Sequence, residues 1–272
     1  MKKMVIFWLL VLLITQTGFA AGERFAAGGR SLALGSASVA LCDLWSLCNN
    51  QAGAAWLKRV SVGLGFENRF LLKELMYKQV GFALPLKAGT IGLVANHSGT
   101  GQYSEMKAGL SFARKFGKYF SVGIQLTYLR IHISEDYGNK NLVSCEIGLM
   151  YHADRHLTVG VQLLNPVPVK INDYPMEQLP GLIVAGISYS FSRDFMATLE
   201  AEKDLEHPLI LRAGAEYHMV SHAYARIGIS TNPTSFSFGF GLEFGRITID
   251  MASGYHQALG FSPSGSVIYS FR

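Results

Sequence analysis

The sequence has little charge and no long apolar run after its first twenty residues, and each shortage excludes a class of protein. Only 16% of the 272 residues are charged, and removal of Lys2 and Lys3 lowers the formal charge from +5 to +3. That is too little for an electrostatic nucleic-acid surface, so we expect no nucleic-acid partner. A transmembrane helix needs about 18 continuous apolar residues, and no later segment approaches this length.

Cysteine is also scarce, with Cys42, Cys48 and Cys145 as the only three. An odd number of cysteines in an exported chain does not indicate a disulfide framework. The sequence leaves open whether Cys42 and Cys48 form a disulfide with each other or remain free thiols.

The N-terminus predicts export. Lys2 and Lys3 precede an apolar run from Val5 to Ile14, and small residues follow up to Ala20. A basic start, a run of about ten apolar residues and a small-residue cleavage site are typical of a secretory signal peptide. We predict that residues 1–20 are that signal peptide.

Helical periodicity is almost absent from Val60 onward, and an alternating pattern takes its place. From Ser235 to Phe244, one face carries only large apolar side chains and the other carries Ser, Gly and Glu. Such period-two patterns predict strands with one apolar face. Each is about ten residues long, as in tilted transmembrane strands. We predict about fourteen: 59–69, 76–86, 90–97, 103–115, 119–133, 142–153, 157–164, 181–191, 195–204, 208–219, 223–231, 235–244, 247–256 and 261–271.

The connections between these strands alternate in length. Tight links such as Gly117-Lys118 and Gly245-Arg246 follow every second strand, and longer links such as 134–141 and 165–180 lie between them. An even strand number with this alternation is typical of bacterial outer-membrane barrels. We therefore predict an all-β fold, a single antiparallel transmembrane β-barrel over residues 58–272, in the cell outer membrane of a Gram-negative bacterium. The alternative is a soluble β-sandwich, in which the apolar faces would pack against each other inside.

Residues 21–57 precede the first predicted strand and are too apolar to lie free in water. A barrel of about fourteen strands is too wide for its wall side chains alone to fill. We therefore predict that residues 21–57 form a plug in the lumen. Its candidate residues are Arg30, Leu41, Asp43, Trp45, Asn49, Asn50, Gly53 and Trp56.

Glycine recurs at inward-facing positions in nearly every predicted strand. Glycine in a strand often marks close approach of another backbone, which predicts a glycine belt around the plug. The alternative is that these glycines only ease strand curvature. The belt comprises Gly63, Gly81, Gly92, Gly109, Gly123, Gly148, Gly160, Gly186, Gly214, Gly228 and Gly241.

A family resemblance rests on two motifs of the plug segment. Residues 28–41 read GGRSLALGSASVAL, and residues 50–54 read NQAGA. These resemble the "GAR-x-x-x-x-G-x-A-x-x-A" start and the "NPAGL" motif of PorV/PorQ-type proteins, relatives of FadL-type barrels, with Gln51 in place of the proline. The resemblance implies a FadL-type outer-membrane barrel. Barrels of this kind serve either type IX secretion or the uptake of hydrophobic compounds, and the resemblance leaves open which of the two applies.

The inward positions also carry charges of both signs, which either brace the wall and dock the plug or line a polar path. They include Glu105, Lys107, Glu146, Glu200, Glu202, Arg212, Glu216, Arg226 and Asp250. An apolar solute pocket finds little lining in this wall beyond Tyr77, Val94, Met150, Met196 and Tyr224. We find no serine–histidine–carboxylate order, no metal-ligand spacing and no phosphate-binding loop. We therefore predict no enzyme activity, no catalytic residue, no metal site and no cofactor.

The proline-rich link 165–180 carries apolar side chains such as Val167 and Leu179. It is either a docking site for a secretion-apparatus or surface-protein partner, or a lid over the barrel mouth. Our first functional hypothesis is an accessory barrel of a secretion or surface-assembly apparatus. The second is a FadL-like transporter or diffusion channel for small hydrophobic or amphipathic solutes. Outer-membrane lipid and the barrel-assembly machinery are expected partners in both cases.

Overall fold

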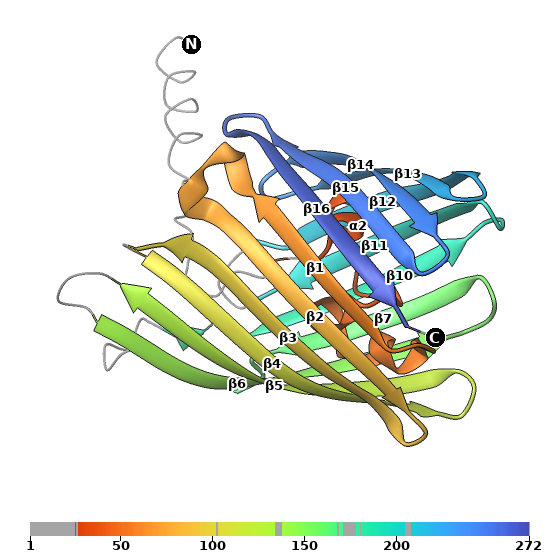
Figure 1. Ribbon diagram of the computed structural model, residues 1–272, viewed down its shortest axis with the longest axis horizontal. Coiled ribbons are helices and arrows are strands. Elements are labelled where there is room, and N and C mark those ends of the chain that lie inside the picture. The colour runs from red at the N-terminus through yellow and green to blue at the C-terminus, as the bar shows by residue number, and fades with distance from the viewer. Residues whose placement is uncertain are drawn as a thin grey trace, which may run out of the picture.

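The computed structural model describes residue 25 and residues 27–271, apart from 102, 134–137, 168, 171–177, 180 and 205–207. The predicted signal peptide lies outside these residues. Fourteen antiparallel strands close into one barrel (Figure 1). They are β1 (Ser61–Asn68), β2 (Met76–Leu86), β3 (Gly89–Thr100), β4 (Tyr103–Phe116), β5 (Phe120–Ile133), β6 (Gly138–His152), β7 (Leu157–Leu164), β10 (Leu182–Ser190), β11 (Phe195–Lys203), β12 (Ile210–Val220), β13 (Ala223–Ser230), β14 (Ser235–Phe244), β15 (Ile247–His256) and β16 (Gly260–Ser270).

The strand prediction is confirmed, and the first strand pairs with the last to close the sheet, as Ser61 opposite Ser270 shows. Every link at one end has two to four residues, whereas the other end also has longer links: 69–75, 165–181 and 204–209. We call these ends the short-turn end and the long-loop end. The prediction missed a small hairpin inside the 165–180 link, formed by β8 (Val169–Lys170) and β9 (Gln178–Leu179). Two-residue strands are too short to produce a readable alternation.

Most large apolar side chains of the strands face outward. In β5, Leu126 is 63% exposed, whereas its neighbour Gln125, which points inward, is 2% exposed. The soluble-sandwich alternative is therefore wrong, because it would bury the apolar face and expose the polar one. Exposed aromatic side chains gather at the short-turn end: Phe116, Tyr119, Phe191, Phe195, Tyr217, Phe244 and Phe271. An apolar outer band with an aromatic rim is the surface expected of a barrel in lipid.

Residues 27–57, here called the lumenal segment, lie within the ring of strands and are coloured red to orange in Figure 1. The segment contains α2 (Gly29–Ala33), α3 (Ser46–Asn49) and the 3-10 helix η1 (Gln51–Trp56). Two further short 3-10 helices, η2 (Arg69–Leu71) and η3 (Lys73–Leu75), connect β1 to β2. None of the helices in the described ranges is long and apolar enough to cross a membrane.

Candidate functional site

The lumenal segment folds into short turns because its own polar side chains satisfy its backbone. Asn49 accepts a hydrogen bond from the backbone N–H of Ala27 at 2.8 Å and donates to the hydroxyl of Ser31 at 2.8 Å. Asn50 caps η1 by accepting from the N–H of Ala52. Its amide also donates to the carbonyl of Val39 at 2.7 Å. These two asparagines therefore hold the start, middle and end of the segment together.

A small apolar core joins the segment to the wall. Leu44, Trp45 and Leu47 are each 2% exposed or less. They pack in one cluster with Ala54 and with side chains from the wall, including Val94. Trp56 lies at the short-turn end, where its indole N–H donates to the hydroxyl of Ser121 at 2.9 Å.

The inward-facing glycines make room for the segment. A Cβ atom added to Gly214 would lie 2.6 Å from the carbonyl oxygen of Leu34, and one added to Gly63 would lie 2.6 Å from the Leu44 side chain. Such approaches are below van der Waals contact, so a larger residue would displace the segment. The same holds, with various partners in the segment, at Gly92, Gly123, Gly148, Gly160, Gly186 and Gly228, whereas Gly81 has ordinary contact distances of 3.6 Å or more.

Two glycines of the predicted belt do not face the segment. A Cβ on Gly109 would meet the Gln125 side chain, and one on Gly241 would meet the guanidinium of Arg226. These two make room for neighbouring wall side chains instead. The prediction missed Gly239, where an added Cβ would lie 2.7 Å from the Ala33 Cβ, and Gly65, where it would lie 3.3 Å from the Trp45 ring. Gly239 and Gly241 both lie on the inner face of β14. They differ only in depth along the lumen, and α2 lies at the depth of Gly239.

Three buried carboxylates of the wall bind the segment at three separate places. Glu216 accepts two hydrogen bonds of 2.8 Å from the guanidinium of Arg30. Glu200 accepts from the backbone N–H groups of Ser38 and Val39, at 2.8 and 2.7 Å. Hydrogen bonds to a charged group are the strongest of their kind, and the two Arg30 bonds form a bidentate pair.

The third carboxylate, Glu146, accepts a 2.6 Å hydrogen bond from the side-chain amide of Gln51. The ammonium of Lys107 lies 2.7 Å from its other oxygen. Gln51 occupies the position at which the resembled motif has proline. An amide donor there gives the segment a polar attachment that a proline side chain could not provide.

Four further charges of the predicted lumen set, Glu202, Arg212, Arg226 and Asp250, pair within the wall. Arg226 lies between Glu216 and Asp250, with a nitrogen–oxygen distance of 2.6 Å to each. Arg212 contacts Glu200 at 3.2 Å and Glu202 at 2.8 Å. Asp43 of the segment joins the first group through Arg30 at 3.3 Å. Buried charges are tolerated only when they are compensated in this way.

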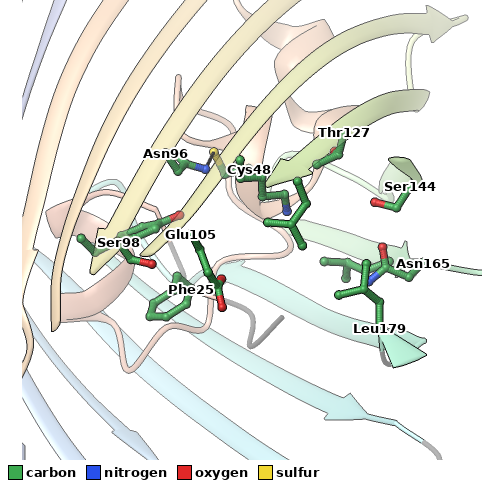
Figure 2. Close-up of a pocket in the computed structure, with 13 residues that line it drawn as sticks. Phe25, Cys48, Asn96, Ser98, Glu105, Thr127, Ser144, Asn165 and Leu179 are labelled. Carbon is green, nitrogen blue, oxygen red and sulfur yellow. Dashed lines mark hydrogen bonds between the residues drawn. The ribbon is translucent and has the colours of Figure 1, made fainter. Parts of the chain in front are cut away.

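A cavity of about 70 Å³ opens at the long-loop end, above the segment. We call it the Leu129 cavity, and Figure 2 shows its side chains converging from the wall, the segment and the 165–180 link. A water molecule needs about 10–15 Å³ of such volume, so several waters or a small organic molecule fit. The lining comprises Phe25, Cys48, Tyr77, Asn96, Ser98, Glu105, Lys107, Thr127, Leu129, Ser144, Leu164, Asn165 and Leu179.

The apolar part of this cavity corrects the expectation that the wall offers little apolar lining. Leu129, Ile131 and Leu142 are inward-facing and buried near the long-loop end, where they pack with Leu179 of β9. The strand alternation that places Gln125 and Thr127 on the inner face also places Leu129 and Ile131 there. The apolar lining could therefore have been predicted from the sequence. On the floor, the ring of Phe25 stacks on Tyr77 at 4.6 Å between centroids.

Polar groups occupy the same cavity. Asn96 donates to the sulfur of Cys48 at 3.9 Å, and its side-chain oxygen has no hydrogen-bond partner among the described residues. The hydroxyl of Tyr103 donates to Glu105. The lining thus combines apolar and polar side chains in similar numbers.

A second cavity, of about 160 Å³, lies at the long-loop end on the side of α2. Its lining includes Glu67, Arg69, Arg212 and His256 together with several hydroxyl groups. It is larger, its lining carries more charged and hydroxyl side chains, and it has no counterpart of the leucine cluster around Leu129. We therefore regard the Leu129 cavity as the better candidate for an apolar solute.

No protein-family model matches the sequence, and no curated protein matches it. Solved structures match over nearly the whole chain. The CymD monoaromatic hydrocarbon channel matches with a TM-score of 0.72 at 14% identity, over 93% of this chain and 99% of CymD. The toluene transporter TbuX of Ralstonia pickettii matches with a TM-score of 0.68 at 12% identity, over 92% of this chain and 100% of TbuX.

A Pseudomonas aeruginosa FadL homologue matches with a TM-score of 0.64 at 11% identity, over 94% of this chain and 100% of the homologue. The chain has the fold of FadL-type channels. At such low identities the likeness concerns the fold alone. It gives the FadL part of the family resemblance a structural basis, while the narrower PorV/PorQ resemblance still rests on the two sequence motifs.

The three cysteines of the chain are free thiols, which answers the open question of Cys42 and Cys48. Burial raises the pKa of the Cys42 thiol to about 12 and that of the Cys48 thiol to about 11. Both side chains are therefore protonated at neutral pH and react slowly with electrophiles. Cys48 lines the Leu129 cavity, whereas Cys42 lies at the opposite, short-turn end.

Proposed function

We propose that this protein is a non-enzymatic outer-membrane transporter for small hydrophobic or amphipathic solutes. The observation that carries the proposal is the Leu129 cavity, in which buried leucines and two stacked aromatic rings adjoin Asn96, Glu105 and Lys107. An apolar solute with one polar end would find both kinds of partner there. The hydrocarbon channel and the toluene transporter with the same fold support this solute class.

The outer membrane is the proposed location. The exposed apolar band and the aromatic rim match the needs of a barrel in lipid. The predicted signal peptide over residues 1–20 would export the chain, and the barrel-assembly machinery would insert it. In this orientation the short-turn end faces the periplasm and the Leu129 cavity opens toward the cell exterior.

The lumenal segment is proposed to act as the plug. Its Cys48 forms part of the cavity floor beside Phe25, and the segment is held by Glu146, Glu200 and Glu216. A solute that enters the cavity therefore meets a closed floor. Passage requires a rearrangement of the segment or of the wall beside it.

The secretion-accessory hypothesis has less support than the transport hypothesis. Among the structural matches described above, two are named as hydrocarbon carriers and none as a secretion component. The 165–180 link was its proposed partner-docking site, but Leu179 of this link is 3% exposed and packs into the barrel mouth. This contact supports the lid interpretation for the part of the link that the structure describes.

Filling the cavity tests the transport proposal. Ser144 lines the cavity, and Ser144→Phe would occupy much of its volume. Val143 is its neighbour on the outer face and is 64% exposed, so Val143→Phe is the matched control. We expect uptake of radiolabelled toluene by a Gram-negative host to rise when the wild-type protein is expressed. Ser144→Phe should lower this uptake several-fold, and Val143→Phe should leave it unchanged.

The amount of barrel exposed on the host cell surface must be equal for the three proteins, as measured by antibody labelling of intact cells. Uptake by the wild type at the level of the empty host would contradict the proposed solute class. Equal uptake by wild type and Ser144→Phe would contradict the assignment of the Leu129 cavity as the entry site.

A further inference from the structure

Three side chains with soft or borderline metal-ligating atoms meet at the short-turn end of the lumen, away from the Leu129 cavity. The sulfur of Cys42 lies 3.2 Å from the sulfur of Met150. It lies 3.9 Å from the Nε2 atom of His152. A thiol, a thioether and an imidazole nitrogen therefore converge in one small volume, at the junction between the segment and the wall.

The fold brings them together in two ways. Met150 and His152 are two residues apart on β6, so both project from its inner face. Cys42 comes from the loop between α2 and α3, which is fixed by the bonds from Asp43 N–H to the Ser46 hydroxyl and from Trp45 N–H to the Asp43 carboxylate. Glycine at position 148 of the same strand face allows the segment to approach β6 closely.

The imidazole of His152 is already oriented. Its Nδ1 atom forms a 2.9 Å hydrogen bond with the hydroxyl of Thr158 on β7, which leaves Nε2 facing Cys42. The ring of Trp56 packs edge-on against the imidazole, with 4.1 Å between ring centroids. A hydrogen bond to the second ring nitrogen is the support that metal-ligating histidines usually have.

We propose that Cys42, Met150 and His152 form a binding site for a soft monovalent cation, namely Cu⁺. Thiolate and thioether sulfur select Cu⁺, imidazole also suits copper, and Mg²⁺ or Ca²⁺ would need oxygen ligands that this set lacks. Binding replaces the thiol proton of Cys42 by the metal, so one proton is released to solvent and the oxidation state of the metal is unchanged. One thiolate then balances the single charge of the ion.

The site has a structural consequence that is independent of solute transport. A Cu⁺ ion there would join the lumenal segment to β6, in addition to the contacts of Glu146, Glu200 and Glu216. One of the three ligands is a methionine. Among the described ranges, no cluster made only of histidine, cysteine and carboxylate side chains could hold a metal ion.

Titration of the purified, detergent-solubilised full chain with Ag⁺, a redox-inactive analogue of Cu⁺, tests the site. The reference protein is Cys48→Ser/Cys145→Ser, which retains Cys42 as its only thiol. Bound silver is counted by mass spectrometry after gel filtration in chloride-free buffer, and thermal unfolding is measured with and without Ag⁺. We expect one Ag⁺ per chain, release of one proton and a higher melting temperature.

Three further substitutions in this background identify the ligands. Cys42→Ser should abolish binding, and Met150→Leu and His152→Gln should each weaken it about ten-fold or more, a range typical of perturbed metal sites. The unliganded melting temperature of each variant shows whether the barrel is intact. Equal binding by the reference protein, Met150→Leu and His152→Gln would indicate a lone thiol and overturn the proposal. Absence of Ag⁺ binding by the folded reference protein would overturn it as well.

Discussion

At the scale of single residues, glycine decides how close the lumenal segment can come to the wall. The strand backbone at Gly160 and Gly228 lies against the segment backbone at Val39 and Gly35, where even a methyl group would clash. Curvature alone does not require glycine at the height of the segment. The contact pattern therefore favours the close-approach interpretation at these positions, whereas Gly109 and Gly241 serve neighbouring wall side chains.

Substitution of Gly214 separates the two interpretations of the glycine belt. A Cβ at Gly214 would lie 2.6 Å from the Leu34 carbonyl oxygen. Because overpacking typically costs about 1–3 kcal/mol, Gly214→Ala should lower the free energy of unfolding by that amount. The measurement is denaturant unfolding of the refolded barrel in detergent micelles.

The matched control is Gly254, which also faces inward but has its nearest neighbours at 3.8 Å. Gly254→Ala should change the free energy of unfolding by less than about 0.5 kcal/mol. An equal loss in both variants would mean that glycine is needed for strand shape rather than for docking of the segment.

At the scale of elements, two pieces of chain that are not barrel strands shape the lumen. The lumenal segment fills its middle and is attached at Arg30, at the Ser38 and Val39 amides, and at Gln51. The β8–β9 hairpin covers part of the mouth through Leu179. Together they form the floor and one side of the Leu129 cavity.

The hairpin contact predicts the behaviour of Leu179→Asp. A carboxylate cannot remain unpaired among Leu129, Ile131 and Leu142, so the hairpin should leave the mouth. We expect faster cleavage of the 165–180 link by an added protease on intact cells. Val167 is 65% exposed on the same link, so Val167→Asp should keep the wild-type cleavage rate. A wild-type rate for Leu179→Asp would show that the leucine contact does not hold the hairpin.

At the scale of the whole molecule, most apolar side chains of the barrel wall face outward and most of its polar side chains face inward. Inside, charges of both signs pair with each other and with the segment, so the lumen does not present a continuous field of one sign. Beside these charges and the segment, the described part of the lumen contains cavities of about 70 and 160 Å³.

Removal of the segment should open the barrel. We expect a chain with residues 27–57 deleted to show larger single-channel conductance in planar bilayers than the full-length protein. The triple variant Arg30→Met/Glu146→Gln/Glu200→Gln keeps the segment but removes its charged attachments, and it should show brief openings of similar size. Unchanged conductance in both, with the barrel shown to be folded by its heat-modifiable gel mobility, would contradict the proposed plug.

The sequence could predict the wall of this barrel almost completely, because the period-two alternation and the turn lengths are local properties of the chain. Each strand shows which face is apolar, and the even number of strands with alternating links fixes the antiparallel order. The sequence also indicated that the segment before the first strand, of which Phe25 and residues 27–57 are described, belongs inside, because an apolar segment beside a wide lumen has few other places to go.

Tertiary structure alone decided which lumen residues meet. Cys42 and His152 are separated by 110 residues, and Arg30 and Glu216 by 186, so no local pattern reports their contact. The depth of α2 in the lumen places it against Gly239 and not against Gly241. Leu179 of β9 packs against Leu129, Ile131 and Leu142, and this contact forms the apolar side of the cavity. Strand identity is thus set by short-range alternation, whereas the site is set by the register and depth at which the segment packs.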